Sequence, residues 1–361
     1  MGKISSLEYN TLLWFVMRAG YIGLSLSNIL NITKQDSYIG GFIALVLGLI
    51  PFLIFLYLRN YDKEKNIAEI NESVFKKYGK IINIILIIGA IIFVQIVFID
   101  LVYFINSQFL FKTKYIFIAF CFIIPIIYAI YKGINAISKT SLLMFYFVIF
   151  IIICIIIGVT RGINIHNLQP LFQSNFNDLI HVSLIIIAYN ILPIFFLLII
   201  PQKNIKNYSS KKTFLFYLLT LLSLINASFL TISIFGVNLS LLYEYPEFHV
   251  LKKVEMGDFI DRVETIFSLE WIIALLILVI ICIYFIKEMI KTTFKTKEKT
   301  SLIIIIIACL FMIITGPYLF TTNAKAHIFL KGPMLYIMFT FFFIIPLIIM
   351  LRCLLKKHFH Y

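Results

Sequence analysis

Long apolar segments fill most of this sequence and decide what it can fold into. Hydrophobic residues make up 61% of the 361 residues and charged residues 13%, with a mean hydropathy of +1.01. A soluble protein cannot bury so much apolar surface, so we predict an all-α integral membrane protein surrounded by the lipid bilayer. Each segment is near the roughly 20 residues that a helix needs to cross a membrane. We read about ten such transmembrane helices, at about 9–30, 38–58, 81–106, 115–131, 142–160, 179–200, 213–236, 265–286, 301–321 and 333–355.

The positively charged residues lie mainly in the loops and predict the orientation. With the N-terminus in the cytoplasm, 21 of the 31 Lys and Arg residues fall on the cytoplasmic side and 9 on the outer side. Cytoplasmic loops of membrane proteins carry this kind of excess, so both termini are predicted to be cytoplasmic. The net charge of +14 is not accompanied by a basic surface interleaved with aromatic residues, and we therefore predict no nucleic-acid partner.

Two of the ten segments carry helix-breaking residues inside apolar sequence. The first contains Gly20 and Gly23 followed by a polar run, and the sixth contains Pro193. These are the opening segments of two five-segment halves, which we place at about 9–160 and 179–355. Breaks at corresponding places in two halves indicate a ligand site near the bilayer midplane of an inverted-repeat transporter. Each break alone is weak evidence, because glycine and proline are common in membrane helices.

Several side chains near these breaks are candidates for binding a ligand. Arg18 is costly inside a membrane segment and should face a cavity or a partner, although it could also be an arginine whose side chain reaches the headgroup region. Free backbone N–H groups at the breaks can hold a carboxylate, and free carbonyls can hold an ammonium group. The predicted ligand-binding residues are Arg18, Gly20, Tyr21, Gly23, Gln95, Asn190 and Pro193.

One charged stretch, Leu241 to Trp271, separates the seventh and eighth segments and holds seven of the seventeen carboxylates. Its apolar residues take helical spacing from Val254, which predicts an interfacial amphipathic helix within an extracytoplasmic loop at about 237–268. The stretch is either a solvated connector or a surface that docks a partner or gates the outer mouth. For the second reading the predicted residues are Tyr245, Pro246, Asp258, Arg262, Glu264 and Trp271.

Three motifs carry a resemblance to a known family. They are Ile4-Ser5 before the first segment, Asn167-Leu168-Gln169-Pro170-Leu171 before the sixth, and Tyr245-Pro246 followed by Gly257-Asp258-Phe259-Ile260, Arg262, Glu264 and Trp271. In this order they resemble the spore germination permeases, the GerAB-type B subunits of nutrient germinant receptors. The resemblance implies the amino acid–polyamine–organocation superfamily and a LeuT-type fold of two inverted five-helix repeats, with helices 1 and 6 interrupted.

The resemblance also implies a partnership and a location. Such B subunits work with a larger A-type subunit and a C-type lipoprotein, and sense a small-molecule germinant such as an amino acid. The expected site is the spore inner membrane or the bacterial cell membrane. The chain departs from the family pattern in two places. The first segment has no proline after its glycines, and the sixth has Tyr189-Asn190-Ile191 where the family often has Gly-x-Glu. The missing carboxylate favours sensing over ion-coupled transport.

Two functions therefore stay open, and a third is disfavoured. The chain is either a nutrient-sensing receptor subunit or a secondary active amino acid transporter, and both would use the same site. An enzyme would need a nucleophile and base or metal ligands facing one another, whereas the six histidines are scattered over loops and segment ends. The five cysteines form no Cys-x-x-Cys or Cys/His cluster. We expect no catalytic residue, no metal and no cofactor.

Overall fold

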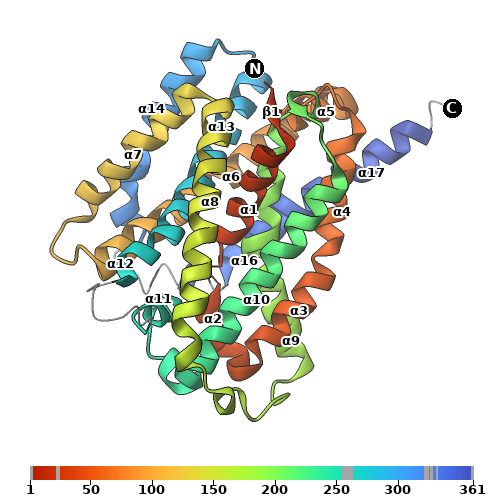
Figure 1. The fold of residues 1–361 in the computed structure, drawn as a ribbon. Helices are drawn as coiled ribbons and strands as arrows, with labels where there is room; N and C mark the ends of the chain where they lie inside the picture. Colours follow the sequence, from red (N-terminus) through yellow and green to blue (C-terminus); the bar gives the residue numbers. More distant parts are fainter. Residues whose placement is uncertain are drawn as a thin grey trace.

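The computed structural model describes residues 3–21, 25–253, 263–320, 325, 328–330 and 332–358. These residues form a bundle of long helices (Figure 1). Nine helices in the described ranges are long and apolar enough to cross a membrane. The predicted first segment is not among the nine, because its continuous helix is only fourteen residues long.

The first half of the chain contributes a short strand and then helices that follow the predicted segments closely. The fourth helix, which is the shortest prediction, is present as α7. The elements are β1 (Ile4–Ser5), α1 (Ser6–Ala19), α2 (Leu26–Thr33), η1 (Lys34–Asp36), α3 (Ser37–Leu47), α4 (Leu49–Tyr61), α5 (Ile67–Phe75), η2 (Lys76–Tyr78), α6 (Gly79–Gln108), α7 (Tyr115–Lys132), α8 (Ile134–Val159) and η3 (Thr160–Gly162).

The second half of the chain contains more irregular helices. Its elements are η4 (Ile165–Leu168), α9 (Phe176–Ile186), η5 (Ile187–Ile191), η6 (Leu192–Ile199), η7 (Gln202–Asn204), β2 (Ile205–Lys206), α10 (Ser210–Ser240), α11 (Pro246–Leu251), α12 (Val263–Phe267), α13 (Leu269–Phe294), α14 (Glu298–Leu319), α16 (Pro333–Phe339), η8 (Thr340–Ile344) and α17 (Ile345–His358).

Both predicted interruptions are visible, but they differ in kind. The first segment stops at Ala19 and resumes as a helix at Leu26. The sixth stays helical and changes its winding, from α in α9 to a π-helix in η5 and a 3₁₀-helix in η6. Pro193 lies in the first turn of η6, directly after the π-helix η5, and because it has no N–H it cannot donate a hydrogen bond to the preceding turn. Departures from α geometry of this kind often mark functional positions in a helix.

Burial separates central helices from peripheral ones. In the apolar window of the span Phe176–Ile199, 94% of the residues are buried, compared with 17% for α8. The sixth segment is therefore the centre of the bundle, whereas α8 presents Leu143, Phe150 and Ile157 on the outside. An outward-facing apolar surface suits a helix whose neighbour is lipid rather than water.

The ends of α1, α4 and η6 are fastened together on the side that carries the N-terminus. Arg59, near the end of α4, is 3% exposed and donates hydrogen bonds to the carbonyls of Leu197 and Ile200 and to the Tyr9 hydroxyl. Next to it, β1 pairs in parallel with β2, with Ile4 opposite Ile205. Neither contact is predictable from a sequence pattern, because both join residues far apart in the chain.

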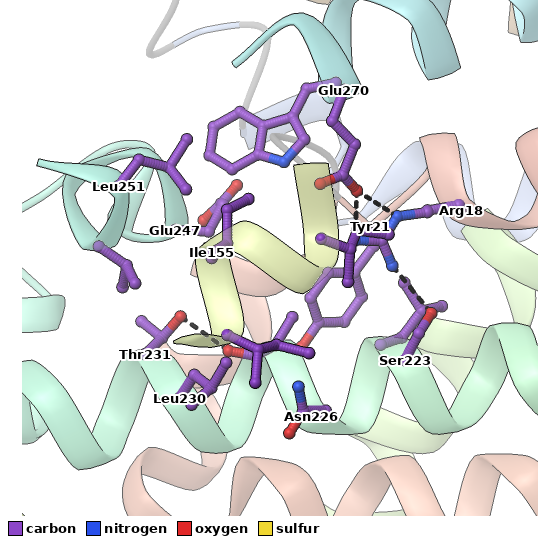
Figure 2. A pocket seen from close by; sticks show the side chains of 16 residues that line it. Arg18, Tyr21, Ile155, Ser223, Asn226, Leu230, Thr231, Glu247, Leu251 and Glu270 are labelled. Atoms are coloured by element: carbon purple, nitrogen blue, oxygen red, sulfur yellow. Dashed lines mark hydrogen bonds and ion pairs between the residues drawn. The ribbon is translucent and has the colours of Figure 1, made fainter. Parts of the chain in front are cut away.

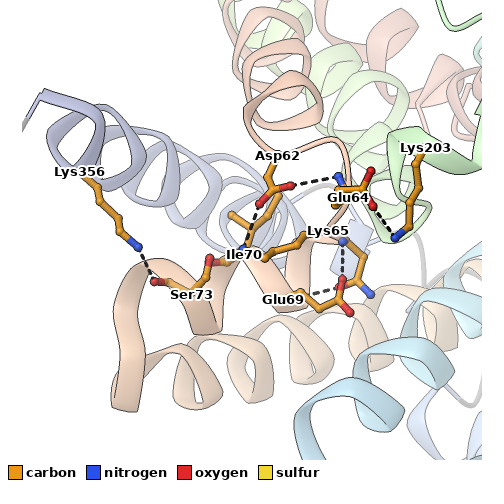
Figure 3. A network of polar contacts seen from close by, with 9 residues as sticks. Asp62, Glu64, Lys65, Glu69, Ile70, Ser73, Lys203 and Lys356 are labelled. Carbon is orange, nitrogen blue, oxygen red and sulfur yellow. Dashed lines mark hydrogen bonds and ion pairs between the residues drawn. The ribbon is translucent and has the colours of Figure 1, made fainter. Parts of the chain in front are cut away.

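The loop after α4 holds a polar network on the same side of the molecule (Figure 3). Lys65 pairs with Asp62 at 3.0 Å, and Lys203 pairs with Glu64 at 2.7 Å. The backbone carbonyl of Ser73 accepts a hydrogen bond from the Lys356 amine at 2.8 Å, which connects α17 to α5. The side chains of Glu64 and Lys203 are largely exposed, so their pair contributes less than about 1 kcal/mol to stability.

Candidate functional site

The interruption of the first segment lies directly against the sixth. A Cβ atom added at Gly20 would lie 1.9 Å from the backbone oxygen of Tyr189 in η5. Only glycine allows the end of α1 to approach η5 so closely. The Tyr189 hydroxyl in turn donates a hydrogen bond to the carbonyl of Leu330. The two segments that were predicted to form a ligand site therefore meet, and the contact between them is tight.

Two predicted ligand-binding residues of the sixth segment, Asn190 and Pro193, are buried inside the bundle. Asn190 is fully buried, and its amide nitrogen donates to the carbonyl of Ile186 at 3.1 Å. Its side-chain oxygen has no hydrogen-bond partner among the described residues. Pro193 is also buried.

Arg18 at the end of α1 forms an ion pair across the bundle. Its guanidinium contacts the carboxylate of Glu270 in the first turn of α13 and donates to the Ser223 hydroxyl of α10 at 2.8 Å. The side chains of Arg18 and Glu270 are 8% and 1% exposed. Glu270 also lies at the positive end of the α13 helix dipole, which stabilises a carboxylate there. The arginine inside the first segment therefore has a buried partner.

This ion pair borders a cavity of about 160 Å³ between α1, α8, α10, α11 and α13 (Figure 2). Its charged groups are the ion pair and a second carboxylate, Glu247 of α11, and its neutral polar side chains are those of Tyr21, Ser223, Asn226 and Thr231. Leucine, isoleucine and valine side chains form most of the remaining wall. The described lining is Arg18, Tyr21, Ile152, Ile155, Ile156, Ser223, Leu224, Asn226, Ala227, Leu230, Thr231, Glu247, Val250, Leu251, Glu270 and Trp271.

The structure brings only part of the predicted ligand set to this cavity. Arg18 and Tyr21 line it, and the Tyr21 hydroxyl also contacts the Ser228 hydroxyl of α10. Gly20, Asn190 and Pro193 are absent from its lining. Gln95 lines a separate apolar cavity of about 660 Å³ between α6, α13 and α14, and its amide donates to the carbonyl of Met312 at 3.2 Å. In this structure Arg18 and Tyr21 therefore line one cavity and Gln95 another, and Asn190 lines neither. Gly23 lies outside the described residues.

Three of the four predicted docking or gating residues that the structure describes are packed inside the protein. Tyr245, Pro246 and Trp271 are buried, and the rings of Tyr245 and Trp271 lie 5.0 Å and 5.6 Å from the ring of Phe104. The buried side chains are not presented to a partner. Glu264 in α12 is partly exposed. Asp258, Arg262 and most of the predicted interfacial helix lie outside the described residues, which resume with α12.

Sequence reasoning alone did not single out Glu247, Glu270 or Ser223 as members of the site. Glu247 and Glu270 were counted with the charged loop, because they belong to a run of seven carboxylates. The sequence does contain a pattern that points to the pairing of Arg18 with Glu270. An arginine inside a membrane segment needs a counter-charge, and Glu270 lies just inside another apolar segment. Within the part of the chain that the structure describes, no group of three or more His, Cys, Asp or Glu residues is placed to hold a metal ion.

Comparison with known proteins agrees with this architecture. The fold is similar to that of a Na⁺-coupled sialic acid symporter in its substrate-bound outward-open state, with a TM-score of 0.63 and 12% identity over 95% of this chain and 80% of the symporter. That likeness shows the fold alone, and it confirms the predicted LeuT type.

Curated relatives are similar in sequence as well. Spore germination protein A2 of Bacillus subtilis (strain 168) is 25% identical over 286 residues, which cover 76% of this chain and 77% of that protein. Spore germination protein KB of the same organism is 25% identical over 182 residues, covering 49% and 48%. The family described as spore germination protein matches residues 3–324. The chain therefore belongs to the spore germination permease family.

Proposed function

We propose that this chain is the nutrient-sensing membrane subunit of a spore germinant receptor. It binds a small solute, such as an amino acid, in the cavity next to the interruption of the first segment, and binding triggers germination. Family membership supports a receptor or permease role in the membrane. The observation that carries the binding site is the buried Arg18–Glu270 pair, which places opposite charges on the wall of a cavity of solute size.

The position of this pair suggests how binding acts on the fold. Arg18 ends α1, Glu270 begins α13, and Ser223 lies in the middle of α10, so the three residues join separate elements. A polar solute in the cavity competes for these contacts and favours a different arrangement of the three helices. A ligand shifts a conformational equilibrium only by its difference in affinity between the two states. The receptor would convert that difference into a signal to its partner subunits.

The proposed partners and orientation follow from the family and from the charges. The partners are an A-type subunit and a C-type lipoprotein, and the membrane is the spore inner membrane or the cell membrane. With both termini cytoplasmic, a cysteine at Lys253 is labelled from outside and one at Lys65 is not. Labelling of the cysteine at Lys65 and not of the one at Lys253 would show that the orientation is the opposite of the proposed one. Co-purification of the tagged chain with the products of neighbouring genes tests the partners.

A secondary transporter for an amino acid is the second candidate. The symporter-like fold and two buried carboxylates at the cavity, Glu247 and Glu270, supply what ion or proton coupling would need. Uptake of labelled amino acids by proteoliposomes under an imposed proton or sodium gradient separates the two functions. Gradient-dependent accumulation would establish transport, and binding without accumulation would favour a sensor.

The decisive experiment replaces Arg18 in spores. We expect Arg18→Gln to raise the concentration of single L-amino acids required for germination, or to abolish the response, after the response is normalised to the amount of variant protein in the spore membrane. Arg352→Gln is the matched control, because Arg352 is exposed on α17. An unaltered concentration dependence for Arg18→Gln would show that the cavity does not bind the germinant.

A further inference from the structure

A groove of about 720 Å³ lies between α4 and α17, and its Asp62 and Lys356 also belong to the polar network of Figure 3. Its wall on α4 extends from Leu53 to Tyr61, which is about 12 Å along the helix axis. Lys356 and Lys357, near the end of α17, form the facing wall. The groove shares no residue with the cavity of the candidate functional site. It reaches from the apolar part of α4 to the charged end of the bundle.

The apolar end of the groove continues a stripe of exposed side chains. Val46, Ile50 and Leu53 are 61%, 55% and 60% exposed. They belong to one helical span, Leu26–Tyr61, and are three or four residues apart, so they lie on the same face. Exposed apolar residues on a membrane helix pack against lipid. An acyl chain that follows this stripe is therefore led into the groove.

The other end of the groove is positively charged. Lys357 is exposed, and the Lys356 ammonium uses one of its three N–H donors on the Ser73 carbonyl, at 2.8 Å. The carboxylate on the wall, Asp62, is paired with Lys65 at 3.0 Å. The three lysines and Asp62 together carry three positive charges and one negative charge. An anionic group is favoured beside them.

The combination of an apolar stripe and a basic end fits a phospholipid of net negative charge. A lysine ammonium and a lipid phosphate form a charge-assisted hydrogen bond. The quaternary ammonium of a zwitterionic headgroup would lie beside the same lysines, which repel it. The predicted orientation places this end of the bundle in the cytoplasmic leaflet, where anionic lipids create a negative surface potential. A free phosphate ion would use the lysines but not the stripe.

We propose that the groove binds an anionic phospholipid, with its phosphate at Lys356 and Lys357 and one acyl chain along Val46, Ile50 and Leu53. The inference goes beyond the proposed receptor function and does not depend on it. The lipid joins α17 to α4, and α4 in turn holds α1 and η6 at the same end of the bundle. The bound lipid therefore becomes part of the packing at this end.

Native mass spectrometry of the purified full-length protein tests the headgroup preference without any mutation. The protein in detergent is titrated with dioleoylphosphatidylglycerol or with dioleoylphosphatidylcholine, which have the same acyl chains. We expect the first phosphatidylglycerol to bind at least about tenfold more tightly than phosphatidylcholine. Equal affinities would overturn the proposal. Displacement of the bound lipid by an equal concentration of inorganic phosphate would reveal a site for a free anion and would overturn it as well.

Variants that remove charge locate the phosphate. Lys356→Gln together with Lys357→Gln should lower the affinity for phosphatidylglycerol about 25-fold, a factor of about five for each lysine. Arginine at both positions keeps the charges and should keep the preference. Lys132→Gln together with Lys139→Gln is the matched control, because these exposed lysines of α7 and α8 do not line the groove. An unchanged preference in the first double variant, or an equal loss in the control, would refute the assignment.

Discussion

The buried pair of Arg18 and Glu270 gives a quantitative test of the site. Removing one member leaves the other as an uncompensated charge among buried side chains, which costs about 3–5 kcal/mol. Removing both together leaves no charge, and an apolar replacement of a buried pair is often close to neutral. We therefore expect Arg18→Met and Glu270→Met each to destabilise the protein by about 3–5 kcal/mol, and the double variant by no more than about 2 kcal/mol.

The assay is a double-mutant cycle on the protein purified in detergent, with the free energy of unfolding obtained from a denaturant titration. The exposed pair of Glu64 and Lys203 is the matched control, because its side chains are 71% and 48% exposed. Its coupling energy should stay below about 1 kcal/mol, whereas that of the buried pair should be at least about 4 kcal/mol, from the single and double effects expected above. Single-variant effects at Arg18 and Glu270 that add to within about 0.5 kcal/mol would refute the pair as an energetic unit.

Three further perturbations test contacts outside the pair. Gly20→Ala places a Cβ 1.9 Å from the Tyr189 carbonyl oxygen, so it should destabilise the protein by about 1–3 kcal/mol. Gly332→Ala is the control without a clash, because a Cβ there meets nothing within 4 Å and the φ of Gly332 is negative. Arg59→Leu leaves the Leu197 and Ile200 carbonyls without a buried donor and should cost about 2–4 kcal/mol in the denaturant titration, with exposed Arg352→Leu unaffected. Burial, and then the charge of Lys252, lowers the pKa of His249 to about 4, so the folded protein favours the neutral imidazole ring. The stabilisation by the neutral ring is present above pH 6.5 and is lost as the pH falls from 6.5 towards 4. This part of the pH dependence of the melting temperature should be absent from His249→Gln.

The sequence was sufficient to predict the places of the membrane segments, although the first of the ten predicted segments is not among the nine long apolar helices of the described residues. Hydropathy alone located α6 to within two residues at each end, because a segment of that length has no alternative environment. The same reasoning found the interruption after Ala19, since two glycines three residues apart weaken a helix. In the sixth segment the sequence indicates where the helix is irregular but not how, because a single proline in an apolar run does not distinguish a break from a change to π- and 3₁₀-helix.

The site was predicted less well, because residues that are neighbours in sequence point to different sides of the same segment. Gly20, Arg18 and Tyr21 are neighbours in sequence, and a reading by position assigns them to one cavity. In the structure Gly20 faces Tyr189, whereas Arg18 and Tyr21 face α10 and α13. The remaining members of the cavity come from segments up to 252 residues away, as the pair of Arg18 and Glu270 shows. No periodicity in a single sequence reports which distant helices will be neighbours.

If the chain has the proposed function, the placement of the first segment between these two faces would connect binding with signalling. On one side Gly20 touches the backbone of η5, and on the other Arg18 holds α13 and α10. Because Gly20 and Arg18 are two residues apart, a solute that changes the contacts of Arg18 cannot leave the packing at Gly20 untouched. Close-packed interfaces of this kind switch between discrete arrangements rather than deform gradually. The clamp of Arg59 and the strand pair restrain the N-terminal end of α1, so the proposed movement is confined to the end that borders the cavity.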